Sequence, residues 1–181
     1  MDQLNPLAVL VRNEPGVLAR VSGLLARRGF NIHSLAVGET EDPQVSRMSI
    51  FISGDDAVRE QAVKQLRRLV DVIRVSDLTD TPRVERGLAL IKVAAPRERR
   101  SEIIELANIF RAAITHVDNA TMVLEVSGNR NKIEAMIGMM RPFGILEMAR
   151  TGQIVMLRGQ AALAPAASDG PDPAWLAEAA S

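Results

Sequence analysis

The sequence contains no cysteine in its 181 residues, which excludes disulfide bridges, zinc ribbons and thiol nucleophiles. It has only two histidines, His33 and His116, and they lie in different halves of the chain. A transition-metal site needs several nitrogen or sulfur ligands together, and a serine–histidine catalytic site needs an activated serine in a tight turn such as G-x-S-x-G. The sequence offers neither pattern, so we expect no metal-binding and no catalytic residues.

An excess of charge and a long hydrophobic run are also missing. Lys plus Arg and Asp plus Glu number 22 each, which leaves no net field to attract nucleic acid or an anionic membrane. No apolar stretch approaches the roughly 18 residues of a membrane span. The N-terminal residues, with Asp2 and no basic segment, are not typical of a signal peptide. We therefore expect a cytoplasmic protein with neither a nucleic-acid nor a membrane partner.

Aromatic residues are scarce, with four Phe, one Trp and no Tyr. RNA-binding domains with the strand and helix order expected here stack bases on exposed aromatic side chains. Arginine clusters such as Arg27-Arg28 are therefore interpreted as solvated helix faces.

The first half of the chain predicts the order strand, helix, strand, strand, helix, strand. An apolar run at Leu4–Arg12 indicates a strand buried on both faces. A helix is expected from about Pro15 to Arg28, capped by Asn13 or Glu14 and ended by Gly29. Its predicted buried stripe comprises Val17, Leu18, Val21, Leu24 and Leu25. The remaining elements are strands at Phe30–Glu39 and Val45–Ser53, a helix capped within Gly54–Asp56 that buries Val58, Ala62, Leu66 and Leu69, and a strand at Val70–Leu78.

The same order returns after a polar segment at Thr79–Arg86. The expected elements are a strand at Gly87–Ala95, a helix at Arg97–Arg111 burying Ile103, Ile104, Ala107 and Phe110, two strands within Ala113–Ser127, a helix at Asn131–Met140 burying Ile133, Met136, Ile137 and Met140, and strands at Ile145–Ala149 and Ile154–Leu157. The right-handed crossover rule folds each half into a four-stranded sheet with both helices on one face. The predicted fold is α+β, with two ferredoxin-like βαββαβ domains in tandem at residues 1–79 and 84–158. Residues 159–181 are rich in Ala, Pro and Asp and predict a disordered tail.

The loop Asn13–Gly16 is the strongest candidate for a ligand-binding site. Pro15 alone suits a plain helix start. Gly16, however, removes a side chain where free N–H groups meet the positive end of the helix dipole, an arrangement that suits a carboxylate. The amide of Asn31, after the helix, suits an amino group or the second carboxylate oxygen. Together they indicate an amino-acid ligand.

Several of these segments closely resemble the ACT domain of the small regulatory subunit of acetohydroxyacid synthase, also called acetolactate synthase. They are Asn13–Leu18, Arg28–Leu35, Ser46–Met48 and Val70–Val75. Residues Val84–Arg86 and Leu88–Val93 are similar to the opening of the second, ACT-like domain of that subunit. The resemblance covers about residues 4–158.

The resemblance implies a non-catalytic subunit that activates a catalytic large subunit and confers feedback inhibition by a branched-chain amino acid, usually valine, in valine, leucine and isoleucine biosynthesis. It implies thiamine diphosphate, magnesium and FAD in the catalytic subunit and no cofactor in this chain. Valine, leucine and isoleucine stay open as the effector, because one methylene is worth only about 1 to 3 kcal/mol.

The resemblance also implies an effector site shared by two ACT domains that pair edge to edge as a homodimer. Carried over by residue, the effector-binding set is Asn13, Gly16, Val17, Leu18, Asn31, Ile32 and Gln61.

Three other functions are considered. A free-standing ACT-type amino-acid sensor that regulates a different partner would not co-purify with a large thiamine-diphosphate-dependent subunit. An autonomous small enzyme is disfavoured, because no acid–base or nucleophile constellation is visible. An RNA-binding module would require salt-dependent RNA binding.

Overall fold

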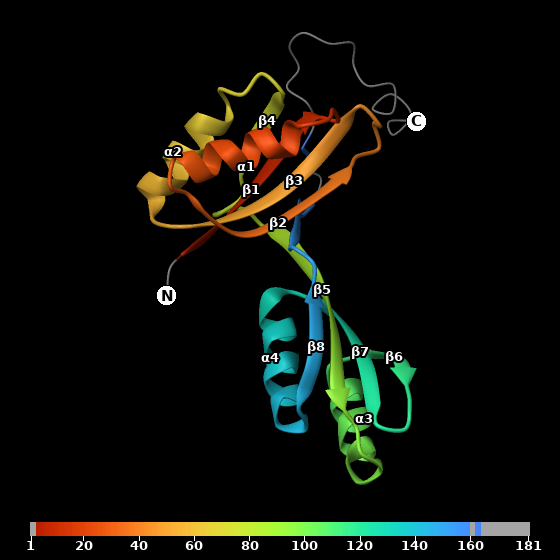
Figure 1. Ribbon diagram of the computed structural model, residues 1–181. Coiled ribbons are helices and arrows are strands. Elements are labelled where there is room, and N and C mark those ends of the chain that lie inside the picture. The colour runs from red at the N-terminus through yellow and green to blue at the C-terminus, as the bar shows by residue number, and fades with distance from the viewer. Residues whose placement is uncertain (1–2, 160–161, 164–181) are drawn as a thin grey trace. The chain divides into compact units, whose positions relative to one another are not determined.

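The computed structural model describes residues 3–159 and 162–163. It divides into two compact units (Figure 1). The first consists of the described residues up to Val84 together with those from Val155 onward, and the second is Glu85–Ile154. Most of the expected tail, with Trp175, lies outside the described residues.

The first unit is a four-stranded antiparallel sheet with two helices. Its elements are β1 (Leu4–Arg12), α1 (Val17–Arg27), β2 (Asn31–Glu39), β3 (Val45–Ser53), α2 (Asp56–Leu66) and β4 (Val72–Asp77). The strand order is β2-β3-β1-β4, so β2 and β4 are the edges. This order confirms the predicted ferredoxin-like βαββαβ fold for this half of the chain.

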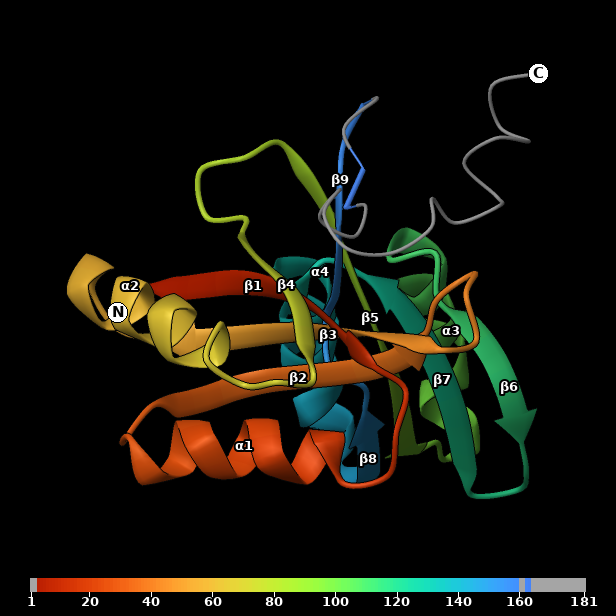
Figure 2. The same cartoon turned by 90° about the horizontal axis from the view of Figure 1, so that it is seen from above.

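Both faces of β1 are buried, as its apolar run predicted. One face joins residues of α1 and α2 in a single core that includes Val9, Val21 and Ala62, so both helices cover the same side of the sheet. Within that layer α1 contacts β2 and α2 contacts β4 (Figure 2). The other face carries a smaller cluster formed by Ala8, Phe51, Leu78 and Val155.

The start of α1 differs from the expectation. The helix begins at Val17, so Pro15 lies in the preceding turn and not in the first helical turn. Gly16 is the N-cap residue and no side chain caps the helix, which makes the predicted caps Asn13 and Glu14 wrong. Leu18 is 45% exposed and does not belong to the buried stripe, because it lies to one side of the row formed by Val17, Val21 and Leu25. At the other end Gly29 has a positive φ of 76°, as a helix-ending glycine should.

The second unit repeats the fold. Its elements are β5 (Arg83–Ala94), the short 3₁₀ turn η1 (Arg97–Arg99), α3 (Arg100–Ile109), β6 (Ala113–Val117), β7 (Thr121–Gly128), α4 (Arg130–Met140), η2 (Arg141–Phe143) and β8 (Ile145–Arg150). The strand order is β6-β7-β5-β8, and a fifth, short strand β9 (Ile154–Leu157) also pairs with β5. Because of β9, β5 begins at Arg83, inside the segment that composition assigned to a polar linker.

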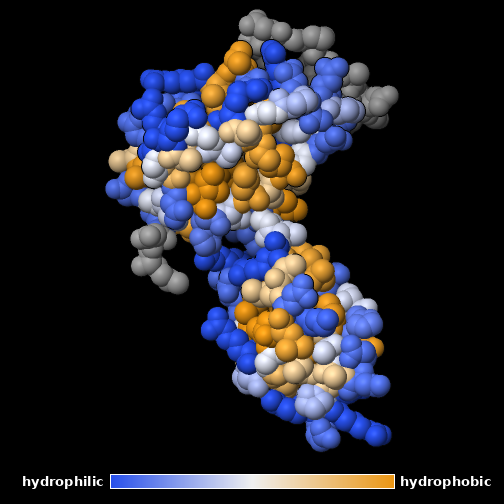
Figure 3. All heavy atoms as spheres, viewed as in Figure 1, coloured by the Kyte–Doolittle hydropathy of each residue, from blue (hydrophilic) through white to orange (hydrophobic). Residues whose placement is uncertain are grey.

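The core of the second unit contains all four residues predicted for α4, namely Ile133, Met136, Ile137 and Met140. Ile103 and Ala107 of α3 are buried as expected, but Ile104 is 40% exposed, and its predicted burial is wrong. Ile104 follows Ile103 by one position and is therefore rotated away from the core by about 100°. Other large apolar side chains also reach the surface of this unit, including Ile109, Leu146 and Met148. Figure 3 shows hydrophobic residues, in orange, on the surface of both units.

Three features concern metal binding, membrane insertion and histidine chemistry. No group of three His, Asp or Glu side chains able to hold a metal ion occurs among the described residues. In the part of the chain that the structure describes, none of the helices combines the length and the hydrophobicity of a membrane span. His33 and His116 both lie exposed on strands.

Candidate functional site

The loop that precedes α1 has the geometry of an anion-binding helix start. Gly16 has a φ of 84°, a left-handed conformation that L side chains rarely adopt. A Cβ atom at this position would lie 3.0 Å from Nη1 of Arg20. The N–H of Val17 donates to the carbonyl of Glu14 at 3.3 Å, and that of Arg20 to the carbonyl of Gly16 at 2.9 Å. Because no side chain caps the helix, the N–H groups of Leu18 and Ala19 remain available to a ligand at the positive end of the helix dipole.

An ion pair between Arg20 and Asp71 holds the start of α1 in place. Arg20, one turn into α1, donates from Nε to Oδ2 of Asp71 at 2.6 Å. This hydrogen bond raises the pKa of Arg20, with a smaller contribution from nearby Glu14. Asp71 is buried, and its carbonyl accepts the N–H of Arg12 at 2.9 Å. Sequence reasoning missed both partners, because Asp71 lies 51 positions from Arg20 and no local pattern joins them.

Asn13 ties the loop to the hairpin between β2 and β3. Its Nδ2 donates to the carbonyl of Pro43 at 2.9 Å and to Oε1 of Glu39 at 3.2 Å, and its Oδ1 accepts from Oγ of Ser46 at 3.0 Å. The backbone N–H of Asn13 also donates to the carbonyl of Gln44 at 2.7 Å. The side-chain amide of Asn13 therefore makes most of its possible hydrogen bonds within the chain, and these bonds position the loop beside the hairpin.

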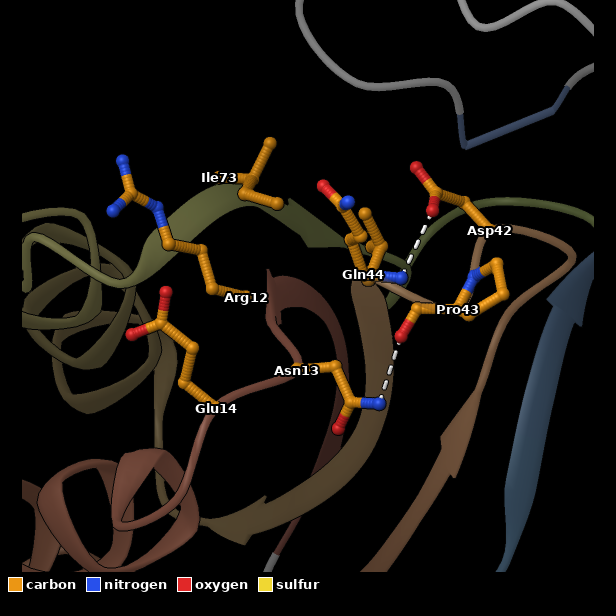
Figure 4. A pocket seen from close by; sticks show the side chains of 8 residues that line it. Arg12, Asn13, Glu14, Asp42, Pro43, Gln44 and Ile73 are labelled. Carbon is orange, nitrogen blue, oxygen red and sulfur yellow. Dashed lines mark hydrogen bonds between the residues drawn. The ribbon is translucent and has the colours of Figure 1, made fainter.

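A recess of about 620 Å³ opens between the loop and the hairpin (Figure 4). The side chains of Arg12 and Glu14 lie on one side of it and those of Pro43 and Gln44 on the other (Figure 4). Asp42, Asn13, Val45 and Ile73 complete the lining. The guanidinium of Arg12 and the carboxylates of Glu14 and Asp42 thus surround a space that an amino acid could enter. Of the eight lining residues, only Asn13 belongs to the effector-binding set expected from sequence.

Asn31 and Ile32 lie at the far end of the same sheet. Asn31 pairs with Ser53 of β3, which in turn pairs with Leu4 at the beginning of β1. Asn13 follows Arg12 at the other end of β1. Since β1 has nine residues and a strand rises about 3.3 Å per residue, the two asparagines are on the order of 30 Å apart. One chain therefore does not bring them into one site.

The other residues carried over from the resemblance also divide into those near the Asn13–Gly16 loop and those away from it. Leu18 is exposed next to Gly16, whereas the side chain of Val17 is buried in the core. Gln61 is exposed on α2, the helix that contacts β4, and so lies away from the β2 edge that begins with Asn31. The structure thus assembles Asn13, Gly16 and Leu18 at one end of the first unit and leaves Asn31, Ile32 and Gln61 apart from them.

Comparisons with known proteins give one consistent result. A family model described as the AHAS small subunit-like ACT domain matches residues 7–74, and a model of the small subunit of acetolactate synthase matches residues 86–159. The chain is 55% identical over 153 residues to a probable acetolactate synthase small subunit of Archaeoglobus fulgidus, covering 84% of this chain and 96% of that protein. It is 54% identical to the acetolactate synthase small subunit of Aquifex aeolicus, covering 84% and 80%.

A solved structure agrees with these sequence matches. The acetolactate synthase small subunit from Thermotoga maritima superimposes with a TM-score of 0.81 at 42% identity, covering 88% of this chain and 99% of that one. The likeness therefore extends over both units of the chain.

Proposed function

This chain belongs to the acetolactate synthase small-subunit family, and from that premise we propose that it binds the catalytic subunit of acetolactate synthase, raises its activity and makes it sensitive to feedback inhibition by a branched-chain amino acid. In this proposal the thiamine diphosphate, magnesium and FAD belong to the catalytic subunit. The chain itself contributes regulation and no chemistry.

The observation that carries the proposal is the uncapped start of α1 at Gly16. The effector carboxylate would accept hydrogen bonds from the N–H groups of Leu18 and Ala19 in the first turn, close to the guanidinium of Arg20. Asn13 would hold the loop in position through its bonds to Pro43 and Ser46. Leu18, exposed beside the loop, would supply apolar contact for a branched side chain.

The second half of the site would come from another copy of the chain. Strand β2 is an edge of its sheet, and an unpaired edge is a template for another strand. If two β2 strands pair antiparallel about a two-fold axis, Asn31 of one copy approaches Glu39 of the other. Glu39 accepts a hydrogen bond from Asn13, so this pairing would unite the two asparagines that one chain keeps apart.

Valine is the effector that we propose. Leu18 of one copy and Ile32 of the other would offer a small apolar surface, and valine has the smallest side chain of the three branched-chain amino acids. Discrimination against leucine and isoleucine is expected to be modest, about 1 to 3 kcal/mol per methylene.

The experiment is reconstitution with the catalytic subunit. Asn13→Ala and Gly16→Asp should abolish inhibition by valine and spare activation, because neither residue belongs to the buried core of either unit. Asn129→Ala is the matched control, since Asn129 also makes a structural side-chain bond, to the N–H of Lys132, but in the second unit. Undiminished valine inhibition in both loop variants would contradict the site. A chain that binds valine but neither co-purifies with nor activates a catalytic subunit would instead be a free-standing sensor.

A further inference from the structure

Arg47 on β3 is a half-buried arginine with no role in the effector site proposed above. In the strand register it lies opposite Leu10 of β1 and Gly38 of β2. Ala8, two positions from Leu10, belongs to the cluster on the sheet face opposite α1 and α2, so Arg47 shares that open face. Burial lowers the pKa of its guanidinium. A guanidinium is rarely withdrawn from water without a specific hydrogen-bond partner.

The partner of Arg47 is strand β9. Nη2 of Arg47 donates to the carbonyl of Val155 at 2.6 Å, and the N–H of Val155 donates to Oγ of Ser49 at 3.2 Å. The side chain of Val155 is 2% exposed and packs with Ala8 and Phe51. Val155 is thus held through its N–H, its carbonyl and its side chain. It is also the residue at which the chain re-enters the first unit.

The residue before Arg47 connects the same strand to the effector loop. Ser46 donates to Oδ1 of Asn13 at 3.0 Å. Successive residues of a strand point to opposite faces, so β3 holds the loop on one face and β9 on the other at adjacent positions. A displacement of β3 at Ser46 therefore also displaces Arg47.

We propose that Arg47 is a positioning residue that couples the Asn13–Gly16 loop to strand β9. A change in the loop alters the hydrogen bonds that Arg47 and Ser49 make to Val155. The change in these bonds then affects the segment that joins the two units, because Val155 lies at its end. The coupling itself depends only on the described hydrogen bonds. Its use in regulation rests on the proposed function.

Amide hydrogen exchange on the whole chain tests the coupling without any effector. Ser46→Ala breaks the link on the loop side and touches no part of β9, yet exchange of the amides of residues 154–158 should rise several-fold. Ser22→Ala is the matched control, because Ser22 also donates a side-chain hydrogen bond, to the carbonyl of Leu18 on the surface of α1. Equal exchange at residues 154–158 in the two variants would overturn the proposal.

Reconstitution with the catalytic subunit tests the regulatory use. Arg47→Met should bind valine with little change in calorimetric affinity, while the potency of inhibition falls about tenfold, a typical size for an allosteric coupling. Arg47→Lys, which keeps a charged donor, should restore part of the inhibition. Wild-type inhibition in Arg47→Met, or loss of valine binding by it, would overturn the regulatory role of Arg47. If the wild-type chain neither binds valine nor confers inhibition, the proposed function fails, and the exchange experiment still decides the coupling.

Discussion

Gly16 determines the geometry of the loop because its φ of 84° lies in the left-handed region. Gly16→Ala should lower the free energy of unfolding by about 1 kcal/mol, the cost of a left-handed conformation for an L residue. The added Cβ would also displace Nη1 of Arg20, so valine binding should be lost. Chemical denaturation and calorimetric titration measure the two effects.

Gly29→Ala separates backbone strain from the effect on the site. Gly29 has a φ of 76° at the other end of α1, and a Cβ there would meet no atom within 4 Å. The variant should lose comparable stability and keep valine binding. Equal loss of binding in both variants would assign the effect to the stability of α1 and not to the loop.

Asp118, in the turn between β6 and β7, makes the stability of the second unit depend on pH. The N–H of Ala120 and then the hydroxyl and N–H of Thr121 donate to its carboxylate, which lowers the pKa of Asp118 to about 2. Because this folded-state pKa lies below the unfolded value of about 3.9, the stabilisation is complete above about pH 5 and is lost as the pH falls toward 2. The stability difference between wild type and Asp118→Ala should therefore shrink from pH 5 to pH 2 in urea denaturation. A pH-independent difference would show that the turn does not depend on the ionised carboxylate.

The helices and strands were largely predictable because each buries its own apolar pattern. The stripe of α4 is the clearest case, since Ile133, Met136, Ile137 and Met140 are all buried. The start of α1 was not predictable, because Asn13 bonds to Pro43 and Ser46, partners about 30 positions away, and does not cap the helix. Local propensity carries no information on such contacts.

The β2 edge provides a test of the proposed dimer. Val37 on this strand is 44% exposed, and a lysine on an edge strand is a common device against pairing. Val37→Lys should convert a dimer to a monomer in analytical ultracentrifugation and abolish valine binding. Ser76→Lys on β4, the other edge of the same sheet, is the control and should leave both properties intact. Dissociation by the control alone would move the interface to β4.

At the scale of the whole molecule, two separate apolar cores predict two separable stabilities. Leu124 is fully buried in the second unit, as Ile50 is in the first. Either change to Ala should cost about 2 to 5 kcal/mol in its own unit. Leu124→Ala should spare valine binding and Ile50→Ala should impair it, as measured by differential scanning calorimetry with and without valine. Loss of valine binding in Leu124→Ala would contradict a site confined to first-unit residues.

The return of the chain to the first unit at β9 could not be predicted from the sequence. The periodicity of residues 154–157 indicated a strand, and β9 is one. Its position on the face of the first sheet opposite α1 and α2 depends on a hydrogen bond between Arg47 and Val155, which are 108 positions apart. An isolated arginine within an apolar strand is the only signal that the sequence offers, and it does not identify the partner.

The separation of Asn13 and Asn31 along one sheet has a genetic consequence. In a two-fold pair, each site would combine Asn13 of one copy with Asn31 of the other. A mixed pair of Asn13→Ala and Asn31→Ala chains would then have one doubly defective site and one intact site. Two alleles that are each insensitive to valine should therefore complement when co-expressed, and random pairing at equal expression should restore about one quarter of the sites. A site built within one chain would give no complementation.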